Sequence, residues 1–238
     1  MMYFYERSSY GVKFNKKSMI ATISADVVSS TQLSVEETII LKNKINSVFC
    51  LLESKYPGFW GRQIKGDYIE CVVPDVPAVL RVALILKTAI KSLAIDERGN
   101  KKKFQNYGLR LSIGIGEMRI VNREEGIIDG EAIYSSGRGL EKLEKLSKGT
   151  MSIHIKNDFL SPLLNTIILL VDALVNDATR RQSEVLYYKL LSTNECDIAE
   201  ILKINQAAVN QRSMGAKWYC VEETLKCFET LNFDRNDK

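Results

Sequence analysis

Apolar and polar residues alternate along residues 19–25, and this period of two predicts a β-strand. The period lengthens after Ser34, where apolar residues recur every three or four positions as far as Tyr56. Ser34 is a residue type that caps helix N-termini, and Pro57-Gly58 ends the pattern. A long helix is therefore expected directly after the first strand.

Two short β-prone segments follow at residues 60–64 and 68–73, separated by Lys65-Gly66. A glycine in so short a connection favours a tight turn, so these segments are predicted to pair as a hairpin. Pro77 then opens a second amphipathic helix, because proline suits the first helical turn.

The middle of the chain continues this mixture of strands and helices. Residues 109–115 alternate as a strand, residues 130–146 have helical periodicity, and residues 150–155 form a last strand. Charge-rich segments at 96–103 and 119–129 are expected to be solvated loops. The order β-α-β-β-α-β-α-β predicts an α+β fold with helices packed on one mainly antiparallel sheet.

The pattern becomes all-helical after Pro162. A boundary near residues 157–162 would divide the chain into an α+β domain, 1–158, and an all-α domain, 159–238. The helices expected in the second part are 163–179, 182–191, 197–202, 207–213 and 217–231.

Composition narrows the class of protein without indicating an activity. Hydrophobic residues make up 45% of the 238 positions and the net charge is +4, which is ordinary for a globular protein and too mild to imply nucleic acid. The five cysteines have no CxxC spacing and are interpreted as reduced thiols. The start lacks the pattern of a leader, and no apolar run approaches the roughly 18 residues of a membrane span. The sequence therefore predicts a cytoplasmic protein without a membrane partner.

Two aspartates stand at strand ends beside small residues. Asp26 follows the first strand, and Asp67 follows the hairpin glycine. A carboxylate at the tip of a buried strand is costly without a partner, and two together repel unless a cation lies between them. A divalent metal with phosphate oxygens suits such ligands. Taken singly, each aspartate is equally typical of a turn or a cap.

Four motifs follow one another along residues 19–155: Asp26-Val-Val-Ser-Ser-Thr31, Lys65-Gly-Asp67, Leu109-Arg-Leu-Ser-Ile-Gly-Ile-Gly-Glu117 and Asp129-Gly-Glu-Ala-Ile-Tyr-Ser-Ser-Gly-Arg138. Their order and spacing resemble the class III nucleotidyl cyclase catalytic domain, and the resemblance implies a ferredoxin-like sandwich. With its helical tail, the whole chain resembles the bacterial SatD family.

The cyclase resemblance implies roles for particular residues. Asp26 and Asp67 would bind two Mg²⁺ or Mn²⁺ ions, and Arg138 would stabilise charge on the transferring phosphorus. Lys65 is a candidate phosphate ligand, although a solvated turn residue is the alternative. Without the resemblance, Arg138 is a surface salt-bridge residue. The turn that would offer backbone amides to phosphate comprises Val27, Ser29, Ser30 and Thr31.

Two candidate nucleotide-binding positions depart from the purine cyclases. Gln63 stands where a lysine or glutamate reads the base, and Tyr134 stands where an asparagine orients the ribose. Glutamine can still donate to and accept from a base edge. These departures favour a different nucleotide, such as a pyrimidine, or binding without turnover. Class III sites form between two subunits, so the resemblance also implies a head-to-tail homodimer.

Residues 195–218 resemble a helix-turn-helix of bacterial regulators. Ile198 and Leu202 are spaced for the inner face of a first helix, and Val209 anchors the second. The residues expected to point outward from the second helix toward DNA are Gln206, Asn210, Gln211 and Arg212. From residue 161 onward the chain holds nine Lys/Arg and eleven Asp/Glu, a net charge of −2, so a helical hairpin used for dimer packing is the alternative.

The sequence thus supports three hypotheses. In the favoured one, the protein is a regulator whose cyclase-like domain binds a nucleoside triphosphate with a divalent metal and whose helix-turn-helix binds DNA. In the alternative, it is an active metal-dependent nucleotidyl cyclase with a regulatory tail. In the third, it is an interaction protein that binds no ligand.

Overall fold

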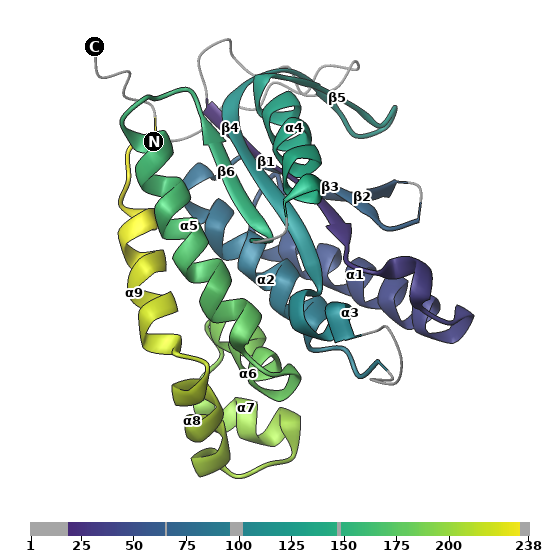
Figure 1. Cartoon of the computed structure of the whole chain (residues 1–238), viewed down its shortest axis with the longest axis vertical. Helices are drawn as coiled ribbons and strands as arrows, with labels where there is room; N and C mark the ends of the chain where they lie inside the picture. The colour runs from purple at the N-terminus through teal and green to yellow at the C-terminus, as the bar shows by residue number, and fades with distance from the viewer. Residues whose placement is uncertain (1–18, 65, 96–101, 147–148, 234–238) are drawn as a thin grey trace.

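The computed structural model describes residues 19–64, 66–95, 102–146 and 149–233 of the chain. A six-stranded sheet lies at its centre in the order β2-β3-β1-β4-β5, and β6 pairs with β4 (Figure 1). The β4–β6 pair is parallel and the other pairs are antiparallel. The strands are β1 (Met19–Val27), β2 (Trp60–Ile64), β3 (Tyr68–Val73), β4 (Leu109–Asn122), β5 (Ile127–Gly130) and β6 (Met151–Ile155).

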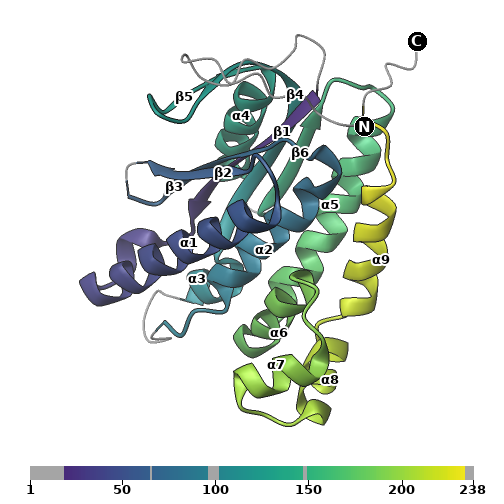
Figure 2. The same cartoon turned by 180° about the vertical axis from the view of Figure 1, so that it is seen from behind.

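Helices cover both faces of the sheet. Helix α4 lies on the face turned toward the viewer in Figure 1, and α1 and α2 lie on the opposite face, in front in Figure 2. The helices and 3-10 turns of this part are η1 (Ser30–Gln32), α1 (Val35–Lys55), η2 (Val76–Ala78), α2 (Val79–Lys91), α3 (Lys102–Tyr107) and α4 (Glu131–Lys145).

The central strand β1 is enclosed by both helix layers. Ile23 and Ala25 belong to the hydrophobic core that also contains residues of α1 and α2. On the other face, Thr22 and Ser24 contact α4, where Ser136 Oγ lies 3.1 Å and 2.8 Å from their hydroxyl oxygens. Small polar side chains at these positions let the helix rest directly on the strand.

Helix α4 also approaches β4 closely at Gly114. A Cβ atom at this position would lie 2.1 Å from the carbonyl oxygen of Ala132. The close approach requires glycine, and it fixes the helix that carries Arg138 against the sheet.

The loop prediction for residues 119–129 was wrong. The strand expected at 109–115 continues to Asn122, and β5 pairs with its extension. Met118, Val121 and Ile128 pack in a small hydrophobic cluster on one side of this hairpin. Three of the charged residues that suggested a loop, at positions 123–125, lie in the turn between the two strands, and the apolar residues fall in pairs on either side of it, without a period of two.

The other charged segment also differs from expectation. Lys102–Tyr107 is a short helix, α3, anchored by the buried side chain of Phe104. Residues 96–101, the rest of the expected loop, lie outside the described residues.

The C-terminal part of the described chain is all-helical, and α5 lies alongside β6 (Figures 1 and 2). One hydrophobic cluster contains residues of α2 and of the sheet together with Ile168, Leu190 and Phe228 from this tail. The core therefore continues across the segment at 157–162. The helices are α5 (Leu160–Asp177), α6 (Arg180–Leu190), α7 (Glu195–Leu202), α8 (Gln206–Gly215) and α9 (Trp218–Glu229).

Helix α5 differs from the expectation that no apolar segment is long enough to span a membrane. By length and composition it could cross a membrane, with a mean hydropathy of 1.4. In the fold it is a core helix on one side: Leu164, Ile168 and Val171 are buried, and the buried carboxylate of Asp172 lies near an amine of α2.

Candidate functional site

Asp26 lies at the end of β1, opposite Arg110 in the β1–β4 register. Arg110 Nη1 donates to Asp26 Oδ2 over 3.1 Å. The other carboxylate oxygen, Asp26 Oδ1, is shielded from solvent and has no hydrogen-bond partner in the described part of the chain. An unpartnered buried carboxylate oxygen is costly, and a cation or a proton at this atom would offset part of that cost.

The protonation of Asp26 reflects this environment. Burial raises the pKa of Asp26 to about 6, the Arg110 guanidinium opposes that rise, and Glu144 and Asp67 add to it. The two aspartates singled out in the sequence therefore interact electrostatically. A bound cation would relieve both the desolvation and the repulsion between them.

Asp67 comes from the β2–β3 hairpin turn, where Gly66 adopts a φ of +79° that favours glycine. Ser30 Oγ donates to Asp67 Oδ2. Ser30 opens η1, directly after Ser29, whose φ is 58°. The turn that follows β1 and the hairpin turn therefore meet at the same end of the sheet.

A pocket of about 480 Å³ opens at this meeting point. Four residues predicted from the sequence line it: Ser30, Thr31, Gln63 and Asp67. The other lining residues come from the hairpin, from the connection between η1 and α1, and from the first half of α1: Leu33, Thr38, Leu41, Lys42 and Gly66.

The remaining residues predicted near this pocket are placed differently. Val27 is buried in β1, and Asp26, Val27 and Ser29 do not line the pocket. Gln63 Nε2 donates to Gly66 O, and Gln63 Oε1 is buried without a partner among the described residues. Lys65 lies outside the described residues.

Arg138 and Tyr134 line a second pocket, of about 640 Å³, between α4 and the β4–β5 hairpin. The Tyr134 hydroxyl donates to Asp129 Oδ1, and Arg119 pairs with the same carboxylate. Within one chain, the structure thus brings Asp67, Ser30 and Gln63 together but places Arg138 and Tyr134 in another pocket. The other lining residues are Glu117, Met118, Gly130, Glu131 and Ser135.

Three residues at these sites were missed by sequence reasoning: Arg110, Lys42 and Arg119. Arg110 occupies a polar position of the alternation at residues 109–115, as Ser112 does, so its place in the sequence carried no signal of a separate role. Its role follows only from the register that sets it against Asp26. Lys42 lies on an exposed helix position that sequence periodicity assigns to solvent.

The donor set at Asp26 and Asp67 is two carboxylates, one of which has an orphaned oxygen. Among the described residues, no group of three or more His, Cys, Asp or Glu is placed to hold a metal ion. Mg²⁺ is commonly bound through one or two carboxylates together with substrate phosphates and water. The residues therefore fit a divalent cation that arrives with a phosphate ligand.

Helices α7 and α8 meet at a turn in which Lys203 has a φ of 52°, and the Asn205 side chain caps α8. Gln206, Asn210 and Gln211 are exposed on α8. Arg212 does not project outward as the sequence analysis expected. Its Nη1 lies 3.8 Å from Glu184 Oε2 of α6, because α8 packs against that helix.

No protein-family model matches this chain, and no curated protein does either. Solved structures that it resembles include a bacterial light-regulated adenylyl cyclase, at 19% identity and a TM-score of 0.40, over 57% of this chain and 75% of that one. A second structure of a bacterial light-regulated adenylyl cyclase matches at 18% identity with the same TM-score, over 57% of this chain and 42% of that one.

Proposed function

We propose that this protein binds a nucleoside triphosphate with a divalent metal at Asp26 and Asp67, and that it is a regulator whose α8 contacts DNA. The observation that carries the first part is the buried, unpartnered Asp26 Oδ1 beside a second carboxylate. An arrangement of this kind is unfavourable in isolation and favourable around a cation.

Side chains of this chain would make most of the contacts to the nucleotide. Arg110 holds one oxygen of Asp26 and leaves the other free, while Ser30 fixes the rotamer of Asp67. Thr31 and Lys42 line the same pocket and can reach phosphate oxygens, and Gln63 can contact a base edge. Asp26 and Asp67 would hold the divalent metal, which would supply positive charge to offset the charge of the triphosphate.

The proposed DNA contact rests on the exposed face of α8. Gln206, Asn210 and Gln211 carry amides, which can bond bidentately to adenine in the major groove. With a net charge of −2 over residues 161–238, the tail would bind with modest affinity and strong salt dependence.

Cyclisation of the nucleotide is a second candidate function, favoured by the exposed Arg138 in a pocket of its own. In a head-to-tail pair of chains, Arg138 of one copy would face Asp26 and Asp67 of the other. The ribose 3′-oxygen would then attack the α-phosphorus, and pyrophosphate would leave with the charge stabilised by Arg138.

Equilibrium binding of the four nucleoside triphosphates with Mn²⁺ tests the first part. We expect at least one to bind, and Asp26→Asn and Asp67→Asn to weaken it by about 10-fold or more. Failure of all four to bind would reject the proposal. Arg138→Ala separates the two functions: it should leave nucleotide binding to the chain in place and abolish any cyclic product.

A mobility shift with fragments of the source genome at two salt concentrations tests the DNA part. Binding should weaken steeply as salt rises. The triple variant Gln206→Ala, Asn210→Ala and Gln211→Ala should lose binding, and unchanged binding by this folded variant would exclude the α8 face.

A further inference from the structure

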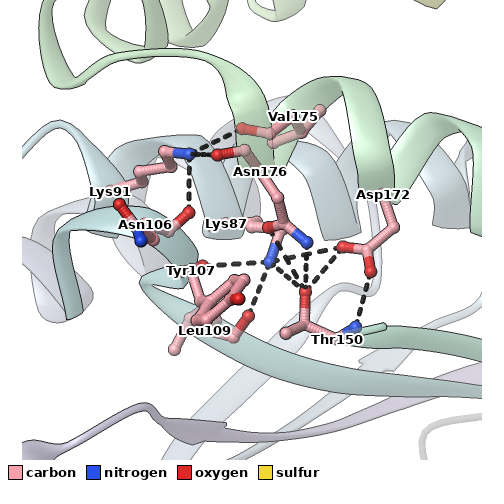
Figure 3. Close-up of polar contacts among 9 residues, drawn as sticks. All are labelled: Lys87, Lys91, Asn106, Tyr107, Leu109, Thr150, Asp172, Val175 and Asn176. Atoms are coloured by element: carbon pink, nitrogen blue, oxygen red, sulfur yellow. Dashed lines mark hydrogen bonds and ion pairs between the residues drawn. The ribbon is translucent and has the colours of Figure 1, made fainter. Parts of the chain in front are cut away.

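Lys87 of α2 is fully buried, and its ammonium group holds one segment of backbone. Lys87 Nζ donates to the carbonyl oxygens of Tyr107 and Leu109 over 2.9 Å and 2.7 Å, and to Thr150 Oγ1 over 2.8 Å (Figure 3). Desolvation lowers the pKa of Lys87 to about 8, against the opposing effect of Asp172, so the ammonium form persists at neutral pH. A buried ammonium is stable only while its partners stay in place.

Asp172 of the tail helix α5 supplies the compensating charge. Its Oδ1 lies 3.5 Å from Lys87 Nζ. The carboxylate also accepts from Thr150, over 2.5 Å from the backbone nitrogen and 2.6 Å from the hydroxyl oxygen. The position of Lys87 is therefore set by a residue from the tail.

The segment held by Lys87 is the same one that holds the end of β1. Between the two carbonyls bound by Lys87, the carbonyl of Gly108 accepts from the backbone nitrogen of Val28 over 3.0 Å. The next side chain, Arg110, pairs with Asp26. Residues 107–110 thus connect Lys87 on one side with Asp26 and Val28 on the other.

We propose that Asp172 and Lys87 are positioning residues for the candidate site, so that the helical tail sets the place of Asp26 through residues 107–110. The effect on ligand binding rests on the proposed metal–nucleotide function. The effect on the end of β1 does not, because it follows from the contacts within the chain. Lys87 interacts electrostatically with Asp172 of the tail and with both Arg110 and Asp26, so it links the two electrostatically as well.

A second ion pair ties the tail to α2 without touching this segment. Arg81 Nε lies 2.6 Å from Glu229 Oε1 of α9. Arg81 Nη1 also donates to the carbonyl of Leu190 over 3.4 Å, and none of the contacts found for Arg81 in the described part of the chain involves residues 107–110. Glu229→Gln therefore weakens the docking of the tail but leaves residues 107–110 alone, which makes it the matched control.

The test uses the full chain with Asp172→Asn and with the double change Lys87→Met and Asp172→Leu. Replacing a buried ion pair by apolar residues of similar size is commonly neutral for stability, so the double variant should fold while losing the clamp. Two readouts are measured: NMR-detected exchange of the Val28 amide, and Mn²⁺-dependent binding of a fluorescent nucleoside triphosphate.

We expect the Val28 amide to exchange about 10-fold faster or more in both variants, and nucleotide affinity to fall by about 10-fold, the usual effect of removing an outer-shell partner. Glu229→Gln should change each by less than about 2-fold. The inference is overturned if the Val28 amide of a folded variant exchanges at the wild-type rate, or if Glu229→Gln changes that rate equally. It is also overturned if the wild type binds nucleotide and the variants bind it with the same affinity. If the wild type binds no nucleotide, the proposed function fails, and Val28 exchange still decides the positioning role.

Discussion

Arg110 and Asp26 face each other across the β1–β4 pair, with Arg110 Nη1 lying 3.1 Å from Asp26 Oδ2. The arginine neutralises part of the aspartate's charge and points its free oxygen away from the ion pair. Arg110→Met should weaken Mn²⁺-dependent nucleotide binding by about 10-fold, because Asp26 loses its orienting partner. Titration calorimetry measures this. Lys226→Met, which removes exposed ion pairs on α9, is the control, and an equal loss in that variant would contradict the assignment.

Ser30 and Asp67 join the two turns of the candidate site. Ser30→Ala removes a hydrogen bond to a charged group at a half-buried position. We expect a loss of about 1 kcal/mol in nucleotide binding, which corresponds to a roughly fivefold weaker Kd. Ser54→Ala, at an exposed position of α1, should leave the Kd unchanged. A Kd for Ser30→Ala equal to that of the wild type would remove Ser30 from the site.

Gly114 and Gly137 offer a matched pair of glycine substitutions. Gly114→Ala would place a Cβ atom 2.1 Å from Ala132 O, so we expect the free energy of unfolding to fall by about 3 kcal/mol. Gly137 lies in α4, but a Cβ atom there would come no closer than 4.0 Å to another element, at the Tyr68 hydroxyl, so we expect a gain of about 0.5–1 kcal/mol for Gly137→Ala. Urea unfolding at one pH measures both. Equal effects at the two positions would show that α4 does not rest on β4 as described.

Lys91 should make stability depend on pH. Burial lowers the pKa of Lys91 to about 7, with the charge of Lys87 adding to the effect. Between this pH and the ordinary lysine range near 10.5, the unfolded chain binds more protons than the folded one. The free energy of unfolding therefore rises with pH above about 7, by at most about 1.4 kcal/mol per pH unit.

Urea midpoints measured between pH 7 and 9 test this dependence. Lys91→Met should reduce the rise, most clearly between pH 7 and 8, because one of the two lysines with a lowered pKa is gone while Lys87 still titrates at about 8. Lys142→Met, at an exposed position of α4, serves as the control and should keep the slope of the wild type. A slope in Lys91→Met equal to that of the wild type would contradict the prediction.

The prediction for helix α8 is that Asn210 and Gln211 matter more for DNA binding than their neighbour Arg212. Asn210→Ala with Gln211→Ala should weaken DNA binding by about 10-fold or more, since each bidentate amide contact contributes about 1–3 kcal/mol of discrimination. Arg212→Ala should weaken it by less than about 3-fold, because this side chain pairs with Glu184 on α6. Mobility shifts at one salt concentration compare them. A larger loss in Arg212→Ala would mean that the Glu184 pair opens on DNA.

The sequence predicted the elements whose signals are local. The hairpin at Gly66 and the cap at Ser34 depend on a few adjacent residues, and the structure agrees there. The first strand begins as expected at Met19 but ends at Val27, two residues later than predicted.

Arg110 could not be assigned a role, because its pairing with Asp26 depends on the register between β1 and β4, which lie far apart in the chain. Arg212 was expected to face outward, but the packing of α8 on α6 brings its side chain toward Glu184. That packing cannot be read from the sequence of α8 alone.

The β4–β5 hairpin was missed for another reason. Between residues 119 and 129 the five charged residues outnumber the four apolar ones. Only the fold shows that Val121 and Ile128 pack in one cluster with Ala132 and Ile133 of α4. A charge-rich segment can therefore form a strand when the apolar residues of one face pack against another element of the fold.

The shared core also governs how the chain can fold as it leaves the ribosome. The sheet is complete once Ile155 has been made, but the cluster that stabilises α2 still lacks Ile168, Leu190 and Phe228. At the usual rates of synthesis, the nascent sheet waits several seconds for these residues. During that time Lys87 and Lys91 stay without the partners supplied by α5, so two hydrated ammonium groups occupy the surface that the tail will later cover. Water must leave both lysines before the last helices can close over them.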